Sequence, residues 1–166
     1  MRIGLVVGAA ALIVAGCGGA QLRPTDPDAQ TSIAAVLDDW HAAAAEADEA
    51  RYFGHFTEDG VFLGTDATER WDVPAFRAYA HPHFENGRAW TFRSARREVV
   101  VEGHLAWFDE DLETENLGPA RGSGVLRYDG ERWRIAHYNL TITIPNERFA
   151  RVREALESEE PAAPEE

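Results

Sequence analysis

Two aspartates spaced two residues apart, Asp109 and Asp111, and one histidine, His137, are the side chains of this sequence best suited to acid–base chemistry. A carboxylate on an apolar surface has a raised pKa and can transfer protons near neutral pH, with an imidazole as the second acid or base. In the alternative, Asp111 and His137 form a solvated pair at the rim of a sheet, where an ion pair contributes little. Which of these two interpretations holds depends on how the strands that carry these residues are paired.

The stretch FLGTDATERW holds a second group of polar side chains. We expect a turn at its centre in which Asp66 accepts backbone hydrogen bonds. Glu69 and Trp71 have the same strand parity, so an inward Trp71 brings Glu69 to the lining of a pocket. A buried Glu69 needs a partner such as Arg93 or Arg121. In the alternative, Glu69 points outward and the stretch only turns the chain.

The connections between four expected strands decide which side chains share a face. The strands are expected at residues 90–101, 104–113, 120–128 and 131–144. Asp129-Gly130 is a strong signal for a two-residue hairpin loop, and residues 114–119 form the connection before it. One face then collects Trp107, Leu126, Trp133 and Ile135 at one end and Asp109, Asp111, His137 and Asn139 at the other. A slip of one residue would reverse this arrangement.

Two glycines, Gly122 and Gly124, lie on that predicted face between the aspartates and His137. Glycine within a strand often marks a bend or the close approach of a ligand or another chain segment. The missing side chains therefore predict a hollow. A ligand occupies this hollow in one reading, and a helix tryptophan such as Trp40 fills it in the other.

Helical spacing precedes the strands. A first helix is expected from the spacing of Ile33, Val36, Leu37, Trp40 and Ala44. Asp48 is the expected cap of a second helix, and Asp72 with Pro74 starts a third that ends at Gly87. A short last helix should turn Phe149, Val152 and Leu156 inward. Helices followed by a meander predict an α+β domain, with helices packed on one face of an antiparallel sheet.

Composition and motifs exclude several functions. The net charge is −13 and every basic residue is an arginine, so the chain repels phosphate backbones and nucleic acid is not an expected partner. His81 and His83 point to different sides of a helix, and a zinc site needs three or four converging ligands. No glycine-rich phosphate loop, GxSxG or HExxH is present. We expect no metal and no cofactor.

The amino terminus carries a targeting signal. Arg2 precedes an apolar run that ends in Val-Ala-Gly-Cys at Cys17, the only cysteine. The run is too short for a membrane span and resembles the lipobox of bacterial lipoproteins, in which the cysteine is lipidated. An ordinary secretory signal with an incidental cysteine is the alternative. Lipidation predicts an extracytoplasmic protein of the cell envelope, and Gly18 favours the periplasmic side of the outer membrane in a Gram-negative cell.

The segments around the fold follow from this signal. Residues 1–16 form the signal peptide, residues 17–30 the lipidated Cys17 with a Gly/Pro/Asp-rich tether, residues 31–156 one folded domain, and residues 157–166 an acidic disordered tail.

The order of elements, with GTDATERW, AWFDE, RGSGVL and WRIAHYNL, resembles the SnoaL-like branch of the nuclear transport factor 2 (NTF2)-like superfamily, including DUF4440-type domains. The resemblance covers roughly residues 32–146. It implies a cone in which a curved sheet wraps helices around a pocket. Members include ketosteroid isomerases, polyketide cyclases, dehydratases and non-catalytic modules, so the fold does not choose the function.

The candidate site residues combine the pocket that the resemblance implies with the side chains on the predicted shared face of the sheet. By analogy with the isomerases, Asp109 or Asp111 is the base, and Tyr52 or His137 the donor. The predicted pocket lining is Tyr52, Glu69, Trp71, Trp107, Gly122, Gly124, Trp133, Ile135 and Asn139.

Two functions remain open. One is a lipid-anchored module that binds a small, largely apolar molecule or serves as an accessory module. The other is a cofactor-free isomerase, cyclase or dehydratase that uses Asp109, Asp111 and His137. Under both functions, we expect a homodimer through the outer sheet face, unless a helix covers that face. The strand positions opposite the pocket are apolar there, namely Tyr138, Leu140, Ile142 and Ile144.

Overall fold

The computed structural model describes residues 28–87 and 89–158 of the 166-residue chain. The predicted signal peptide, Cys17, most of the tether and most of the acidic tail lie outside the described residues. The elements, in chain order, are α1 (Ala29–Ala45), α2 (Glu49–Gly54), β1 (Phe56–Leu63), β2 (Arg70–Asp72), α3 (Val73–Glu85), β3 (Phe92–Glu102), β4 (Leu105–Thr114), β5 (Ala120–Tyr128), β6 (Trp133–Ile142), the 3-10 turn η1 (Asn146–Arg148) and α4 (Phe149–Glu157).

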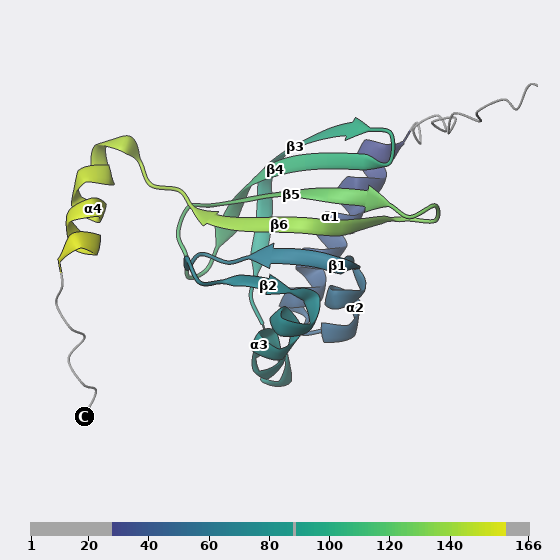
Figure 1. The fold of residues 1–166 in the computed structure, drawn as a ribbon, viewed down its shortest axis with the longest axis horizontal. Helices are drawn as coiled ribbons and strands as arrows, with labels where there is room; N and C mark the ends of the chain where they lie inside the picture. Colours follow the sequence, from purple (N-terminus) through teal and green to yellow (C-terminus); the bar gives the residue numbers. More distant parts are fainter. Residues whose placement is uncertain (1–27, 88, 159–166) are drawn as a thin grey trace, which may run out of the picture.

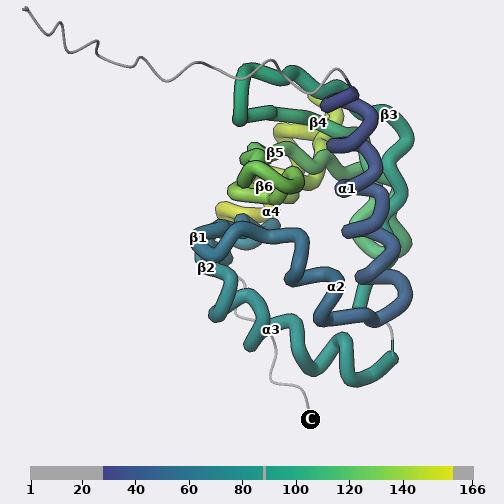
Figure 2. Tube along the Cα trace, turned by 90° about the vertical axis from the view of Figure 1, so that its right-hand side faces the viewer, coloured from purple at the N-terminus to yellow at the C-terminus, as the bar shows by residue number. Residues whose placement is uncertain are grey.

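The six strands form one curved, open sheet in the order β2-β1-β6-β5-β4-β3 (Figure 1). Helices α1, α2 and α3 lie on one side of this sheet (Figure 2). The predicted α+β class, with helices against the concave face, is confirmed. One pairing differs from the expected antiparallel sheet, because β1 runs parallel to β6. This pair joins segments that are far apart in the sequence, so local turn signals could not predict it.

Local rules explain where the helices begin. Asp48 caps α2 by accepting a hydrogen bond from the Arg51 N–H at 3.0 Å. Asp72 caps α3 in the same way through the Ala75 N–H at 2.9 Å, with Pro74 in the first turn. Both predicted starts are confirmed. A side-chain oxygen at the cap satisfies a backbone donor that has no partner within the helix.

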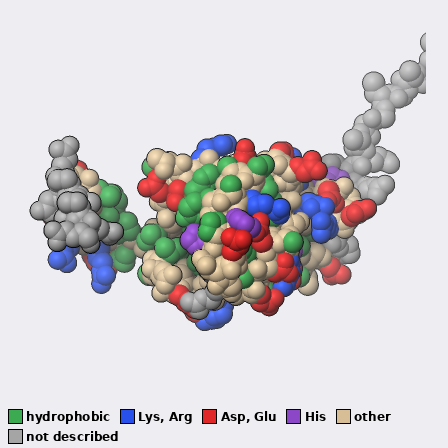
Figure 3. Space-filling model, turned by 90° about the horizontal axis from the view of Figure 1, so that it is seen from below, with side chains coloured by type: hydrophobic (Ala, Val, Ile, Leu, Met, Phe, Trp, Pro, Cys, Tyr) green, Lys and Arg blue, Asp and Glu red, His purple; other side chains and the backbone are tan. Residues whose placement is uncertain are grey.

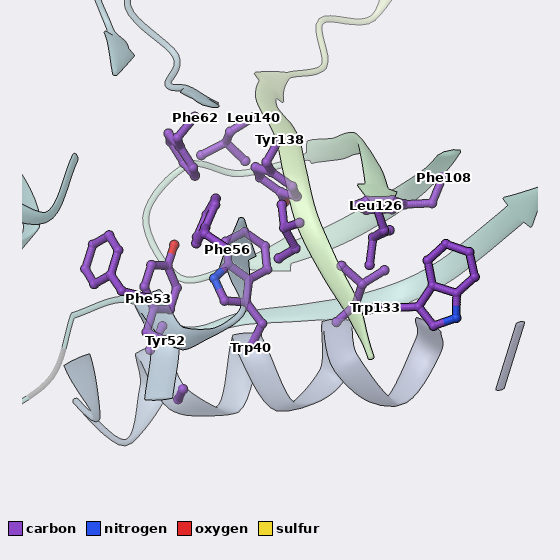
Figure 4. Close-up of a cluster of buried hydrophobic side chains, with 14 of the residues drawn as sticks. Trp40, Tyr52, Phe53, Phe56, Phe62, Phe108, Leu126, Trp133, Tyr138 and Leu140 are labelled. Atoms are coloured by element: carbon purple, nitrogen blue, oxygen red, sulfur yellow. The ribbon is translucent and has the colours of Figure 1, made fainter. Parts of the chain in front are cut away.

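An aromatic core joins the helices to the sheet (Figure 4). Trp40 of α1 lies 4.6 Å from the ring of Tyr138 of β6 at 70°, and 5.1 Å from the ring of Tyr52 of α2. All three side chains are almost completely buried. Removal of such a large ring typically destabilises a protein by about 3–5 kcal/mol. These contacts therefore fix α1 and α2 against the concave face.

The predicted strand register is wrong at two places. Leu112, rather than Glu113, pairs with Ala120, so Asp109 and Asp111 of β4 pair with Ser123 and Arg121 instead of the two glycines. In β6 the register shifts between the partners of Val125 and Leu126, and this irregularity leaves Ala136 out of the pairing. Each slip of one residue turns the following side chains to the other face.

The hairpin between β5 and β6 is also longer than predicted. Its loop spans Asp129 to Arg132, and Tyr128 pairs with Trp133. The Asp129 carboxylate accepts hydrogen bonds from the backbone N–H groups of Glu131 and Arg132, each at 2.9 Å. The two extra loop residues preserve strand parity, so the bulge at Ala136 is what moves His137 and Asn139 to the outer face.

The two tryptophans that define the predicted shared face lie on opposite sides of the sheet. Trp133 is 3% exposed and belongs to the core, whereas Trp107 is 45% exposed on the outer face. The proposed constellation of Asp109, Asp111 and His137 over the glycines is therefore wrong.

The last helix, α4, does not pack as predicted. It projects from the end of β6 (Figure 1), and hydrophobic side chains are exposed on this segment (Figure 3). Phe149 is 59% exposed and Leu156 is 82% exposed. The predicted inward packing of Phe149, Val152 and Leu156 is wrong, because no residue of α4 is buried. No helix among the described residues is long and apolar enough to cross a membrane.

Candidate functional site

A cavity of about 340 Å³ opens between α3, the β1–β2 connection and the segment that follows β4. This volume is typical of sites for small molecules. The lining residues are Phe62, Gly64, Thr65, Glu69, Trp71, Phe76, Tyr79, His83, Ala89, Trp90, Thr91, Phe92, Glu115, Asn116, Leu117 and Leu140. The cavity lies at one end of the core, beside the labelled side chains of Phe62 and Leu140 (Figure 4).

Six of the 16 described lining residues are phenylalanine, tyrosine or tryptophan. Trp71 of β2 stacks on two rings of α3, with centroid distances of 4.5 Å to Tyr79 and 5.6 Å to Phe76. Phe76 stacks in turn on Phe62 of β1 at 4.0 Å. Trp90 lies 6.1 Å from Phe76 with its ring nearly parallel. Nearly parallel rings present a rigid apolar surface, which suits a flat or largely apolar molecule.

The β1–β2 connection places a carboxylate at this wall. The Glu69 carboxylate accepts a hydrogen bond from the Asp66 N–H at 3.1 Å, and Asp66 accepts bonds from the backbone and hydroxyl of Thr68 at 2.8 and 2.6 Å. These bonds from Thr68 hold the pKa of Asp66 below its usual value. The predicted turn with Asp66 as its acceptor is confirmed. Glu69 lies inward, beside Trp71, without an arginine partner among its hydrogen bonds.

Gly64 provides the space for this carboxylate. A Cβ atom at position 64 would lie 2.1 Å from Oε2 of Glu69, far closer than van der Waals contact. The backbone of residue 64 is not in the left-handed region, since no positive φ occurs there. A larger residue at position 64 would therefore displace the Glu69 carboxylate, whereas the turn itself does not need glycine there.

Few other ionisable groups line the cavity. His83 of α3 lies 5.8 Å from Tyr79 and 6.5 Å from Trp90, measured between ring centroids. Glu115 lines the cavity from the segment after β4. No arginine is found among the lining residues that the structure describes.

A charged network lies buried behind the cavity. Glu110 of β4 is completely buried and accepts hydrogen bonds from Nε2 of His41 at 2.8 Å and Nε of Arg97 at 2.9 Å. Because an ionised carboxylate only accepts, Nε2 of His41 carries the proton in this pair. Arg97 Nη2 is a further ion-pair contact at 2.8 Å without hydrogen-bond alignment. Tyr138 donates its hydroxyl to Glu110 over a long 3.5 Å.

Burial and charge act on this network in opposite directions. Burial alone would raise the pKa of Glu110, but the hydrogen bonds and positive charge of His41 and Arg97 outweigh it and hold the pKa below the usual value. Burial and the neighbouring Glu110 charge raise the pKa of Tyr138 well above its usual value. Glu110 is therefore ionised and Tyr138 neutral at neutral pH, as a structural network requires.

Gly122 and Gly124 make room for this network and for the sheet, not for a ligand. A Cβ atom at Gly122 would lie 2.2 Å from the Tyr138 hydroxyl and 3.0 Å from Oε1 of Glu110. At Gly124 it would lie 2.2 Å from the carbonyl oxygen of His137. The predicted hollow is thus filled by protein, with Tyr138 rather than Trp40 in direct contact with the glycine.

The predicted acid–base residues lie on the outer face. Asp109 and Asp111 each lie 3.1 Å from a guanidinium nitrogen of Arg96, and Asp111 also contacts Arg121. These arginines lower the pKa of Asp111. His137 pairs with Val125 and Val61 in the sheet, away from the cavity. Asp111 therefore forms an exposed ion pair, as in the alternative to the catalytic site, but its partners are arginines and not His137.

The predicted pocket residues are divided among four places. Glu69 and Trp71 line the cavity. Tyr52, Trp133 and Ile135 are buried in the core, Gly122 and Gly124 lie under the network, and Trp107 and Asn139 are on the outer face. Burial raises the pKa of Tyr52 well above its usual value. The Tyr52 hydroxyl has no hydrogen-bond partner among the described residues.

Two groups of residues were missed from the sequence. Tyr79 and His83 follow the inward Phe76 by three and seven residues, so helical spacing could have placed them beside the cavity. Glu110 alternates with the apolar residues Phe108 and Leu112, a pattern that predicts a buried carboxylate. Among the described residues, no cluster of three histidine, cysteine, aspartate or glutamate side chains has the arrangement of a metal site.

Comparison with known proteins agrees with this architecture. Three solved structures align with TM-scores of 0.59, 0.61 and 0.56: an NTF2-like protein of unknown function from Pseudomonas putida, a protein of unknown function from Mycobacterium tuberculosis, and an NTF2-like protein of unknown function from Shewanella baltica. Their sequence identities are 16%, 22% and 14%, so the likeness shows the fold alone. The alignments cover 72%, 71% and 74% of this chain and 89%, 78% and 100% of those chains.

No curated protein matches the sequence. The sequence pattern of the SnoaL-like domain matches residues 33–145, which include every helix and strand from α2 to β6 and most of α1. The chain therefore belongs to the SnoaL-like domain family.

Proposed function

We propose that this protein is a lipid-anchored module of the cell envelope whose cavity binds a small, largely apolar molecule. The observation that carries the proposal is the aromatic wall of the 340 Å³ cavity, formed by Phe62, Trp71, Phe76 and Trp90. Burial of apolar ligand surface stabilises a complex by roughly 25 cal/mol per Å² before the entropic penalty of association is subtracted.

The arrangement of titratable groups supports binding over acid–base catalysis. General acid–base catalysis by histidine commonly uses a carboxylate to orient the ring. Among the described residues, three histidines form carboxylate pairs, His41 with Glu110, His55 with Asp39, and His81 with Glu49 and Glu85. None of these residues lines the cavity. The isomerase, cyclase or dehydratase alternative would have to use His83, Glu69 and Glu115 instead.

The proposed anchor rests on the sequence alone. Cys17 follows a short apolar run of the length and composition of a lipoprotein signal, and several acyl chains on one residue give stable membrane attachment. The proposed location is the extracytoplasmic face of the envelope, on the outer membrane where the cell has one. Radiolabelled palmitate should label the protein in cells but not its Cys17→Ser variant, and an unlabelled wild-type protein would contradict the anchor.

The proposal includes a homodimer through the outer sheet face, but the residues of that face differ from those expected from the sequence. Tyr138 and Leu140 are buried on the inner side and cannot form it. The outer face presents Val100 paired with Trp107, which are 46% and 45% exposed. Trp107→Glu should convert a dimer to a monomer in sedimentation equilibrium. A wild-type protein that is already monomeric at high concentration would remove this part of the proposal.

Isothermal titration with an uncharged aromatic probe, 2-naphthalenemethanol, tests the binding function. Thr91 lines the cavity, so Thr91→Trp should fill it and weaken binding by at least about tenfold. Thr141 is exposed on the outer face, and Thr141→Trp is the matched control that should leave the affinity within about twofold. Equal affinities in the two variants would contradict binding in this cavity.

A further inference from the structure

We propose that the cavity selects an organic cation, an amine or quaternary ammonium group on an apolar body, and that the carboxylate of Glu69 is its charge partner. This inference rests on the proposed binding function and specifies the chemical class of the ligand. Three separate observations support it: the position of Glu69, the charges around the cavity and the charge of the whole chain.

The position of the Glu69 carboxylate is built into the β1–β2 connection. Gly64 leaves room for the carboxylate, which receives one hydrogen bond from the Asp66 N–H at 3.1 Å. The Gly64 N–H donates to the Glu69 carbonyl at 2.9 Å, and the Glu69 N–H donates to the Asp66 carbonyl at 3.0 Å. Backbone and side chain of Glu69 are therefore both fixed at the cavity, with further acceptor positions on its carboxylate for a donor.

Basic side chains are scarce in the cavity wall. His83 is the only basic side chain among the lining residues that the structure describes. A carboxylate with a rigid aromatic surface on one side is partly removed from water, which strengthens its attraction to an ammonium group. An anionic ligand would meet the Glu69 carboxylate without an arginine among the described lining residues to compensate it.

The net charge of the chain acts in the same direction. At −13, the protein as a whole attracts cations and repels anions at low ionic strength. This long-range effect is screened by salt within about 10 Å at 0.1 M, whereas a partly buried contact with Glu69 persists. A preference for a cation that survives in salt therefore points to the cavity rather than to the general field.

Two probes of the same shape test the inference. 2-Naphthylmethylammonium and 2-naphthalenemethanol differ at one terminal group, which is cationic in the first and neutral in the second. In isothermal titrations of the full chain at about 0.15 M salt, the cation should bind at least about tenfold more tightly, as expected for one hydrogen bond between charged groups. Glu69→Gln should abolish this preference and leave the affinity for the alcohol within about twofold. Glu58→Gln removes an exposed charge from β1, outside the lining, and should preserve the preference.

A second variant perturbs the same carboxylate without removing it. Gly64→Ala places a Cβ atom against Oε2 of Glu69 and should move the carboxylate, so the preference for the cation should fall while the charge of the protein stays constant. Its unfolding temperature serves as the check that the fold is intact. Equal affinities for the two probes in the wild type, or an unchanged preference in Glu69→Gln, would overturn the inference while binding of the alcohol still supports the proposed function. Failure of both probes to bind would overturn both proposals.

Discussion

Substitution of Glu110 by glutamine tests the buried network most severely. Glu110 is completely buried, and its partners His41 and Arg97 have side chains that are 6% and 10% exposed. Glutamine keeps the shape but presents an NH₂ group where the carboxylate accepts from one partner, and it leaves the guanidinium without its buried counter-charge. Breaking a buried pair typically destabilises a protein by about 3–5 kcal/mol.

We expect the lower end of that range, about 3 kcal/mol, for Glu110→Gln. Arg97 keeps two other acceptors, the Ala34 carbonyl at 3.2 Å and the Asp38 carboxylate at 2.9 Å. Urea unfolding followed by tryptophan fluorescence at pH 7 gives the difference in free energy. A matched exposed substitution, Glu58→Gln, should change the free energy of unfolding by less than about 0.5 kcal/mol.

The pH dependence of this difference has a defined sign. The pKa of Glu110 is lower in the folded protein than its ordinary value, so its contribution is complete above the unfolded pKa of about 4.3. It decreases as the pH falls through the lower folded value. The gap between wild type and Glu110→Gln should therefore narrow from pH 7 to about pH 3.5. A gap below about 1 kcal/mol at pH 7, or one that widens in acid, would refute the stabilising role of the ionised carboxylate.

Three further predictions concern the register, the outer face and the last helix. Gly122→Ala should lower the free energy of unfolding by about 1–3 kcal/mol, since its methyl group would lie 2.2 Å from the Tyr138 hydroxyl, and an unchanged urea midpoint would contradict that contact. Asp109→Asn and His137→Ala should leave the affinity for 2-naphthalenemethanol within about twofold, and a large loss in either would contradict their place on the outer face. Truncation after Asn146 should change stability by less than about 1 kcal/mol, because no residue of α4 is buried; a larger loss in thermal unfolding would indicate packing of that helix.

The sequence predicted those features that depend on neighbouring residues. Asp48 and Asp72 cap helices through bonds to residues three positions ahead, and Asp66 organises a turn within four residues. The fold class was predictable because the spacing of apolar residues changes once along the chain, from helical to strand periodicity. Such signals need no knowledge of which distant segments pair.

Register was harder to predict because it depends on single residues without a distinct signature. Ala136 forms the irregularity that moves His137 outward, and an alanine in a strand gives no warning of it. On β4 the expected connection from Glu113 to Ala120 placed Trp107 on the inner face, whereas burial follows Ala106, Phe108, Glu110 and Leu112. The buried charge of Glu110 hid this parity, since a carboxylate is usually assigned to the surface unless its partners, on α1 and β3, are known.

The indole N–H signals of the five tryptophans offer the most direct test of the cavity as a binding site. In ¹H–¹⁵N spectra, assigned by single Trp→Phe variants, titration with 2-naphthalenemethanol should shift the signals of Trp71 and Trp90, which line the cavity. The signal of Trp107, on the outer face, should remain in place. Shifts confined to Trp107, with Trp71 and Trp90 unchanged at saturation, would contradict the proposed site.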